Sequence, residues 1–427
     1  MDLKNMNLQL RTLAVFAGIR RDPVIDALEQ MTAAGDELTD EQSREVFVER
    51  YCAFAAALYE RDTNWSRYLH ALVMEDDNIC VRRAAAGNVG GRQVSDCSFK
   101  GILQDEVLAE SLERELAILQ ELSLLSSDDL TGGRFSCQIS DLTGGRFSCQ
   151  LPGWETSEYD FAGDYAKHLE ELPRKGYGIF ARYHVFRVED GELAPVLTPD
   201  PQRLSDLVGY EAQREPVIAN TKAFLQGLPA NNVLLYGDAG TGKSSTVKAI
   251  VNEYRDEGLR LIEIKQPQLA QIPAILETLA GNPLHFILFI DDLSFESGNR
   301  EFIALKNILE GGASDTRGNA LIYATSNRRH FVKEDAASRA GSDMFRNDTI
   351  QETMSLAARF GLTVTFQKPA KDLYLQIVEA LAERSGIKME RQDLFTEAEA
   401  FAIRASGRSP RTARQFVDTL NIRQHIT

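Results

Sequence analysis

The chain has 427 residues, of which 43% are hydrophobic and 26% are charged, a composition typical of a globular protein with room for two or three domains. Its net charge of −16 disfavours general binding to a nucleic-acid backbone but does not exclude a local basic groove. The five cysteines form no C-x-x-C pair and the six histidines show no metal-ligand spacing, which argues against a zinc site.

Residues 1–125 are predicted to form a mostly helical N-terminal region with a net charge of −9. Long helices are expected at Glu41–Glu60 and Leu103–Leu125. A leucine stripe at helical spacing predicts a core face rather than a partner-binding zipper, because a coiled coil needs several sustained heptads. The stripe consists of Leu108, Leu112, Leu116 and Leu119. Met1–Asp22 lacks a sufficient signal-peptide core, and no run approaches the ~18 apolar residues of a membrane span, so we expect a cytoplasmic protein.

Residues 126–202 are expected to form a linker that contains a tandem repeat and a small hairpin. Asp129–Gln138 recurs without change as Asp141–Gln150. The Gly-Gly pairs and polar flanks of the repeat predict a loop or hairpin. We interpret it as a duplication in a tolerant loop. The alternative is a duplicated contact in which Arg134 and Arg146 touch a partner.

A second hairpin signal is Asp190-Gly191, which directly follows the strand-like Tyr183–Val188. Beyond a proline cluster, residues 203–367 alternate between strands and helices, which predicts an α/β core with a five-stranded parallel sheet covered on both faces. After Pro369, three helical segments are expected to fill residues 368–427, the part for which the family resemblance described below implies a helical lid. The expected strands are Val233–Tyr236, Leu261–Ile264, Phe286–Ile290, Leu321–Thr325 and Leu362–Phe366.

The sequence Gly237-Asp-Ala-Gly-Thr-Gly-Lys-Ser244 fits the phosphate-binding pattern G-x-x-x-x-G-K-[ST]. It lies between an expected strand and a helix predicted at Ser245–Tyr254. Such a turn directs backbone N–H groups and the positive helix end at anionic oxygens. We therefore predict a nucleoside triphosphate site, in which Lys243 holds the β- and γ-phosphates and the Ser244 hydroxyl ligates Mg²⁺. The loop residues expected to bind the nucleotide are Gly237, Asp238, Ala239, Gly240, Thr241, Gly242, Lys243, Ser244 and Ser245.

Polar side chains also follow two of the expected apolar strands. Asp291 and Asp292 come directly after Phe286–Ile290. Asp291 is predicted to hold Mg²⁺ through water, and Asp292 to orient or deprotonate the attacking water. The alternative is that Asp292 caps the next helix. Asn327 follows Leu321–Thr325 and is placed to reach the γ-phosphate or that water, unless it is only a turn residue.

Ser409-Pro410-Arg411 is typical of a helix start, with Ser as the N-cap and Pro at the first helical position. A basic residue in the first turn opposes the helix dipole unless an anion compensates it. Arg411 is therefore a candidate phosphate contact, and the alternative is a solvated surface arginine.

Together these motifs resemble the AAA+ superfamily of P-loop ATPases over about residues 203–427. Leu204–Tyr210 resembles the segment that contacts adenine in that superfamily, which makes Val208 and Gly209 candidate nucleotide contacts. Asn327 matches the residue termed sensor 1. The resemblance implies a five-stranded core, a helical lid, and ATP with Mg²⁺ as the ligand.

Two further segments carry the resemblance. Ser409–Phe416 is similar to the sensor 2 helix of the Holliday-junction branch-migration motor. Ser355–Gly361 resembles the box with the arginine finger, which implies that Arg359 serves the nucleotide of the adjacent subunit. Ala358 stands where relatives often have Asp.

Three segments are similar to an uncharacterised bacterial family of predicted AAA+ ATPases. Many related motors have Glu at the second position of the pair Asp291-Asp292. In this bacterial family, however, the Asp-Asp pair is usual, so Asp292 does not imply an inactive enzyme. The resemblance implies no substrate. The segments are Ala230–Val233, Ile290–Phe295 and Tyr323–His330.

Three functions remain open from the sequence. The first is a homo-oligomeric ATPase that uses ATP turnover to remodel or load an unidentified macromolecular client, with no membrane association. The second is an ATP-gated switch or scaffold with slow hydrolysis, which Asp292 and the acidic N-terminal region favour. The third is a small-molecule kinase, for which the sequence offers no evident acceptor pocket.

Overall fold

The structure, a computed structural model, describes residues 3–35, 41–88, 98–131, 151–293, 300–311, 318–327, 358–405 and 407–426. It divides into two compact units. The N-terminal unit comprises Met1–Arg182 with Gly281–Pro283, and the C-terminal unit comprises Tyr183–Ala280 with Leu284–Thr427. Among the helices of the described residues, none combines the length and the apolar character that crossing a membrane requires.

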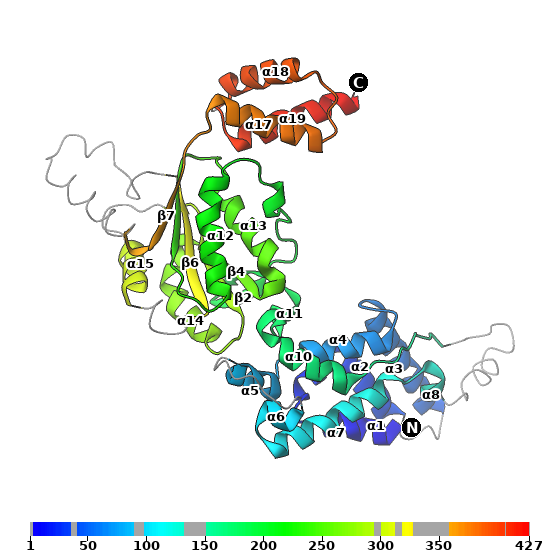
Figure 1. The fold of residues 1–427 in the computed structure, drawn as a ribbon. Helices are drawn as coiled ribbons and strands as arrows, with labels where there is room; N and C mark the ends of the chain where they lie inside the picture. Colours follow the sequence, from blue (N-terminus) through cyan, green and yellow to red (C-terminus); the bar gives the residue numbers. More distant parts are fainter. Residues whose placement is uncertain are drawn as a thin grey trace. The chain divides into compact units, whose positions relative to one another are not determined.

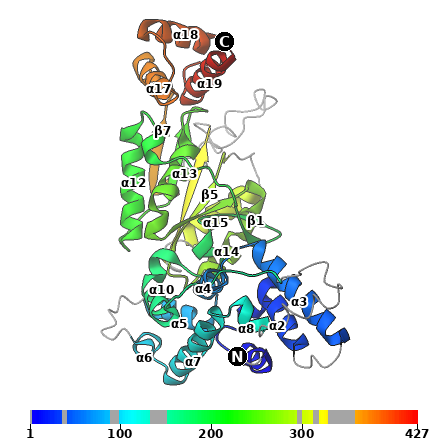
Figure 2. The same ribbon diagram turned by 90° about the vertical axis from the view of Figure 1, so that its right-hand side faces the viewer.

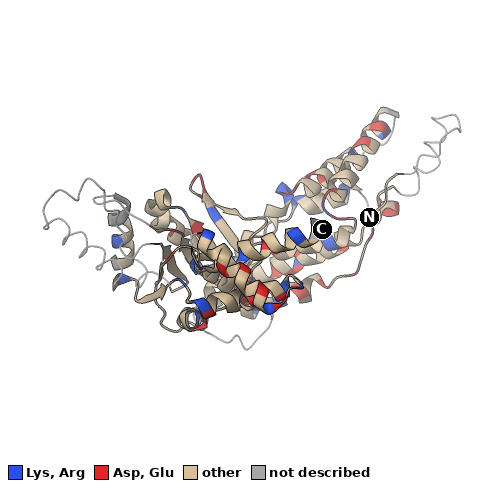
Figure 3. Ribbon diagram, turned by 90° about the horizontal axis from the view of Figure 1, so that it is seen from above, with Lys and Arg blue, Asp and Glu red and all other residues tan. Residues whose placement is uncertain are grey.

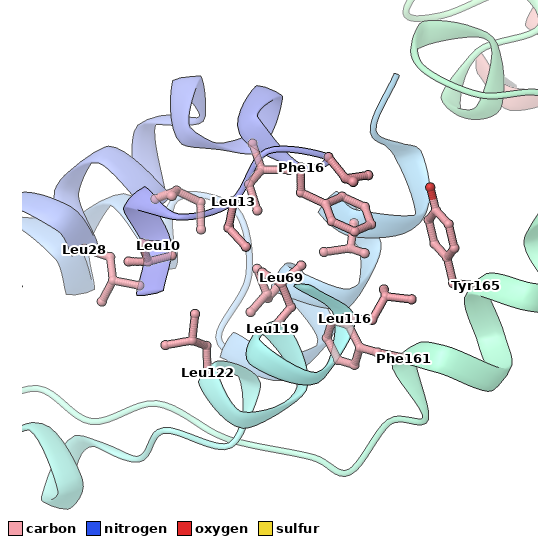
Figure 4. Packing of buried hydrophobic residues seen from close by; sticks show 14 of the residues in the cluster. Leu10, Leu13, Phe16, Leu28, Leu69, Leu116, Leu119, Leu122, Phe161 and Tyr165 are labelled. Carbon is pink, nitrogen blue, oxygen red and sulfur yellow. The ribbon is translucent and has the colours of Figure 1, made fainter. Parts of the chain in front are cut away.

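The N-terminal unit is helical over its described residues (Figure 1). Leu116 and Leu119 of α7 face Leu69 of α4 and Phe161 of α10 in its core (Figure 4). Because Leu112 is buried as well, the prediction that the leucine stripe is a core face is confirmed. The elements are α1 (Leu3–Arg11), η1 (Ala17–Arg21), α2 (Pro23–Ala34), α3 (Glu41–Tyr59), α4 (Trp65–Glu75), α5 (Ile79–Asn88), α6 (Phe99–Leu103), α7 (Glu106–Ser123), α8 (Ser127–Thr131), α10 (Phe161–Lys175) and α11 (Ile179–Arg182).

The segment expected to be a linker, residues 126–202, is shared between the two units. Phe161 and Tyr165 of α10 are fully buried in the N-terminal core (Figure 4). The expected hairpin belongs to the C-terminal unit instead. Residues 132–150, and with them most of the tandem repeat with Arg134 and Arg146, lie outside the described residues.

The C-terminal unit is built on a seven-stranded sheet with the order β2-β1-β4-β5-β6-β3-β7. The five expected strands are all present and pair in parallel, so the predicted α/β class is confirmed. The strands are β1 (Val185–Glu189), β2 (Glu192–Pro195), β3 (Val233–Gly237), β4 (Leu259–Ile264), β5 (His285–Ile290), β6 (Ala320–Ser326) and β7 (Leu362–Phe366).

The sheet has two strands more than predicted because the β1–β2 hairpin extends it. Asp190 and Gly191 both have positive φ, 50° and 87°, as a two-residue hairpin turn requires. β1 pairs in parallel with β4 through Val185, Phe186 and Arg187. The hairpin thereby covers the edge that β4 would otherwise expose to solvent.

Helices cover both faces of this sheet (Figures 1 and 2). α12 (Glu211–Leu225) and α13 (Lys243–Tyr254) lie on one face, and α14 (Ile272–Leu279) and α15 (Arg300–Gly311) lie on the other. Three further helices make up the segment that is expected to act as a lid, and this segment is called the lid below. Because the core strands are parallel, their carboxyl ends meet at one edge, where ligands of such sheets commonly bind. The lid helices are α17 (Lys371–Arg384), α18 (Arg391–Arg404) and α19 (Pro410–Ile426), and the short 3₁₀ turns are η2 (Leu204–Asp206), η3 (Arg255–Glu257) and η4 (Gln266–Gln271).

Basic and acidic residues are interspersed along the helices (Figure 3). In the lid, Arg391 pairs with Glu379 and Arg408 with Glu399. Such exposed pairs contribute at most about 1 kcal/mol each to stability. Apolar packing of α17 against α18 and α19 therefore carries most of the stability of the lid, through residues such as Tyr374.

Candidate functional site

A cavity of about 520 Å³ opens at the carboxyl edge of the core strands. Its size falls within the range of small-molecule sites. Its walls come from the turn between β3 and α13, from the segment before α12 and the start of α12, from the ends of β5, β6 and β7, and from the lid. The lining residues are Gln202, Asp206, Leu207, Val208, Tyr210, Arg214, Gly240, Thr241, Gly242, Lys243, Ser244, Ser245, Thr246, Asp291, Asp292, Asn327, Phe366, Ile377, Leu381, Pro410, Arg411 and Arg414.

Lys243 is the first residue of α13 and is only 5% exposed. Its ammonium donates to the carbonyl oxygens of Gly237 (3.2 Å) and Asp238 (2.8 Å) and to Oδ1 of Asn327 (2.8 Å). Burial lowers the pKa of Lys243, while the carboxylates of Asp238, Asp292 and Asp291 act in the opposite direction. A buried cation is thus held at the N-terminal end of a helix, where anions bind favourably.

Two hydroxyl groups fix the carboxylate of Asp291. Ser244 Oγ and Thr325 Oγ1 each lie 2.6 Å from its Oδ1. The strand register explains the second contact, because Ile290 pairs with Ala324 and the next residues along β5 and β6 are Asp291 and Thr325. Thr325 was not among the residues singled out from the sequence. Its role becomes visible only from the pairing of β5 with β6, which places Thr325 beside Asp291.

Asp292 has a left-handed backbone with φ of 53°, a conformation that Asp and Asn adopt more readily than most residues. Its N–H donates to Thr325 Oγ1 at 2.9 Å, and its Oδ1 accepts from Asn327 Nδ2 at 2.7 Å. Since Asn327 also accepts from Lys243, a hydrogen-bonded chain runs from the lysine through the amide to the carboxylate. Strained backbone of this kind gathers at functional sites.

The oxygen atoms at the end of β5 suit a magnesium ion. Mg²⁺ prefers hard oxygen ligands and is usually held by one or two carboxylates together with substrate phosphates and water. Ser244 Oγ and the carboxylates of Asp291 and Asp292 provide such donors. Within the described residues, no group of three or more His, Cys, Asp or Glu side chains could hold a metal by itself. The donor set therefore fits a metal that arrives with a phosphate ligand.

The first turn of α19 faces the same cavity. Ser409 caps this helix, since its Oγ accepts the Thr412 N–H at 3.1 Å, as the sequence predicted. The side chains of Arg411 and, one turn later, Arg414 line the cavity. Arg414 was missed in the sequence, although its position three residues after Arg411 places it on the same helix face.

The phosphate-binding loop Gly237–Ser244, called the P-loop below, is hydrogen-bonded to the lid segment at two places. Gly240 O accepts the Arg411 N–H at 3.2 Å, at the start of α19. Asp238 Oδ2 accepts the Lys368 N–H at 2.9 Å, just before α17. A Cβ atom at Gly240, which has φ of 76°, would lie 3.2 Å from both Ser409 Oγ and Arg411 Cβ. Glycine thus lets the loop and the lid approach closely.

Some predicted residues lie outside the cavity lining. Gly237, Asp238 and Ala239 contribute to the turn without lining the cavity, and Gly209 packs against α17 instead. Arg359 precedes the amino end of β7, whereas the cavity lies at the carboxyl ends of the strands. The structure therefore does not bring Arg359 to the site of its own chain.

Comparison with known proteins found a family model that matches the C-terminal unit. A family model described as "Protein of unknown function (DUF815)" matches residues 181–424. The replication factor C large subunit of Staphylothermus marinus is 31% identical over 117 residues, which are 26% of this chain and 27% of that protein. The proteasome-activating nucleotidase of Methanocella arvoryzae is 34% identical over 116 residues, 23% of this chain and 28% of that protein. The chain thus spans little more than a quarter of the length of these curated relatives.

A solved structure, the RuvB Holliday junction branch migration motor of Thermotoga maritima, is also similar. It is 20% identical with a TM-score of 0.35, and the match covers 52% of this chain and 67% of that chain.

Proposed function

We propose a function for this chain, which belongs to the family described as proteins of unknown function (DUF815), from the chemistry of its cavity. Its C-terminal unit is an AAA+ ATPase module that binds ATP with Mg²⁺ and hydrolyses it. The resemblance in sequence and the curated relatives, which are AAA+ ATPases, support the general class.

One observation carries the proposal. The ends of β5 and β6 and the start of α13 converge in a single hydrogen-bonded network around the cavity. In it, a buried ammonium, a hydroxyl and two carboxylates lie within reach of one ligand. A triphosphate with its magnesium ion needs all three kinds of group.

The residues that line the cavity have different parts in the proposed reaction. Lys243 and the P-loop N–H groups bind the β- and γ-phosphates, and Ser244 and Asp291 would hold Mg²⁺, which would neutralise phosphate charge. Asp292 accepts a proton from the water whose oxygen attacks the γ-phosphorus as the bond to the β-phosphate oxygen breaks. Asn327 keeps the Asp292 carboxylate oriented, and Arg411 binds the terminal phosphate from the lid.

We further propose that the module acts as a homo-oligomer whose turnover remodels or loads a macromolecular client. The support is the position of Arg359, which lies away from the cavity of its own chain but in a segment that resembles an arginine-finger box. Charged residues supplied by a neighbouring subunit stabilise the transition state in other phosphoryl-transfer enzymes.

A mixing experiment tests this arrangement. Arg359→Ala should lower ATP turnover by about 100-fold or more and leave ATP affinity within a few-fold, because the finger acts in the transition state. Lys243→Ala chains should also be inactive, yet mixing the two variants should restore turnover, since Lys243→Ala chains still offer Arg359 to intact sites. Arg187→Ala, which removes an exposed arginine of β1 paired with Glu189, serves as the control. A protein that stays monomeric with ATP, with unchanged turnover in Arg359→Ala, would contradict the proposal.

The second candidate is an ATP-gated switch that binds tightly and hydrolyses slowly. It is favoured by Asp292, whose short side chain is already engaged by Asn327. Steady-state turnover measured beside ATP affinity separates the two functions. Turnover near the common enzyme range of about 1–10³ s⁻¹ would exclude the switch.

Thr325 provides a third test of the site. Thr325→Val removes a hydroxyl that contacts both Asp291 and the backbone of Asp292, and it leaves the Asp292 N–H without this partner. We expect kcat to fall by about 5- to 150-fold, because loss of such a hydrogen bond costs roughly 1–3 kcal/mol, and the Mg²⁺ concentration for half-maximal activity to rise. Thr325→Ser, which keeps the hydroxyl, should retain most activity. Wild-type kcat and Mg²⁺ dependence in Thr325→Val would argue against this role.

A further inference from the structure

The segment Ser205–Gly209 contacts both α12 and the lid, and its middle residues belong to the cavity wall. Leu207 and Val208 line the cavity from this segment, and Ile377 and Leu381 line it from α17. These four apolar residues come from two elements, and apolar lining of this kind suits an aromatic ring; the part of the cavity that they line is called the slot below. If the proposed function holds, on which this inference rests, the slot receives the nucleotide base.

Arg214 of α12 binds this segment from the core side. It is only 8% exposed. Its guanidinium donates to the carbonyl oxygen of Gly209, to that of Leu207 at 3.1 Å, and to Glu211 Oε1 at 3.3 Å. A buried guanidinium is stable only when its donors are satisfied. Because the Glu211 side chain is 73% exposed, the two carbonyl groups are the well-shielded partners of this cation.

Arg384 binds the same segment from the lid side. It is the last residue of α17, and it donates to the carbonyl oxygens of Asp206 (2.8 Å) and Ser205 (2.6 Å). At the other end of the segment, Gly209 has φ of 76°, and a Cβ atom there would lie 2.8 Å from Leu373 Cδ1 of α17. The segment is therefore attached to the lid at both of its ends.

We propose that Arg214 and Arg384 are positioning residues for recognition of the nucleotide base. Arg214 sets the path of the segment from the core, and Arg384 latches the segment to α17, so that the slot is complete only when the lid is in place. With four carbonyl groups engaged by the two arginines, the backbone around Val208, which lines the slot, is held in one conformation. A fixed backbone donor and acceptor can distinguish adenine from guanine, because the amino group of one is replaced by a carbonyl oxygen in the other.

The exposed latch residue gives the cleaner test. In full-length Arg384→Ala we expect the Kd and KM for ATP to rise about fivefold, since the two hydrogen bonds that are lost are exposed and act on the base only through the segment. The preference for ATP over GTP should fall as well, and kcat should stay within about twofold because Arg384 does not contact the reacting atoms. Arg384→Lys should recover part of the affinity and of the base preference.

Arg391→Ala is the matched control, since Arg391 is another exposed arginine of the lid and pairs with Glu379 on α17. It should bind ATP and GTP as the wild type does. The inference is overturned if Arg384→Ala shows unchanged ATP affinity and base preference, or if it loses ATP and GTP affinity equally together with thermal stability. A wild-type protein that binds no ATP would instead refute the proposed function itself.

Discussion

Lys243→Ala is expected to reduce ATP affinity by about 100-fold or more. The Lys243 ammonium is buried and already directed by the carbonyl groups of Gly237 and Asp238 and by Asn327. A charge-assisted hydrogen bond of this kind contributes roughly 1.5–3 kcal/mol, and a phosphate ligand would receive more than one. Titration of the purified chain with ATP and Mg²⁺ measures the loss, and turnover should disappear with it.

Lys248→Ala is the matched control for this variant. Lys248 is on the same helix, but its ammonium pairs with Glu263 at 2.9 Å and it does not line the cavity. Thermal unfolding without nucleotide shows whether either substitution perturbs the fold. Wild-type ATP affinity in a folded Lys243→Ala variant would refute the assignment of the phosphate site.

Asp292→Asn is expected to lower kcat by about 10²–10⁴-fold, the usual contribution of a general base, while ATP affinity changes only a few-fold. Asn is the appropriate replacement because the backbone of Asp292 has φ of 53°, which Asn tolerates. An amide cannot accept the proton of the attacking water. Single-turnover hydrolysis and equilibrium binding, measured on the same preparation, separate the two effects.

The same substitution at an exposed aspartate provides the comparison. Asp256, in η3, has an 83% exposed side chain and does not line the cavity, so Asp256→Asn should hydrolyse ATP at the wild-type rate. If Asp292→Asn keeps full turnover, the proton acceptor is another group, and the role proposed here for Asp292 is wrong.

Much of the C-terminal fold follows from local sequence patterns. The strand predicted at Leu362–Phe366 has those bounds in the structure, because apolar residues that alternate with threonine favour a strand. The turn at Asp190-Gly191 was equally clear. The strand against which this hairpin packs could not be predicted. The pairing of β1 with β4 joins segments that are far apart in the chain, and no local pattern specifies which sheet edge a hairpin covers.

The candidate site divides in the same way. The P-loop and the carboxylates after β5 are contiguous motifs, and the structure brings Lys243, Asp292 and Asn327 together. Thr325 and Arg384 were not found from the sequence. Their contacts with Asp291 and with the backbone of Ser205 depend on strand register and on the placement of the lid, which residue types alone do not reveal.

The hydrogen bonds between the P-loop and the lid have a thermodynamic consequence. Gly240 is hydrogen-bonded to the start of α19, and Asp238 to Lys368 in the segment that leads into α17, so phosphate binding and lid placement share one set of contacts. Coupling free energies are reciprocal. Any client that grips the lid and favours this placement must tighten ATP binding by the same factor by which ATP tightens the grip on the client. The nucleotide affinity of the protein would then report whether its client is present.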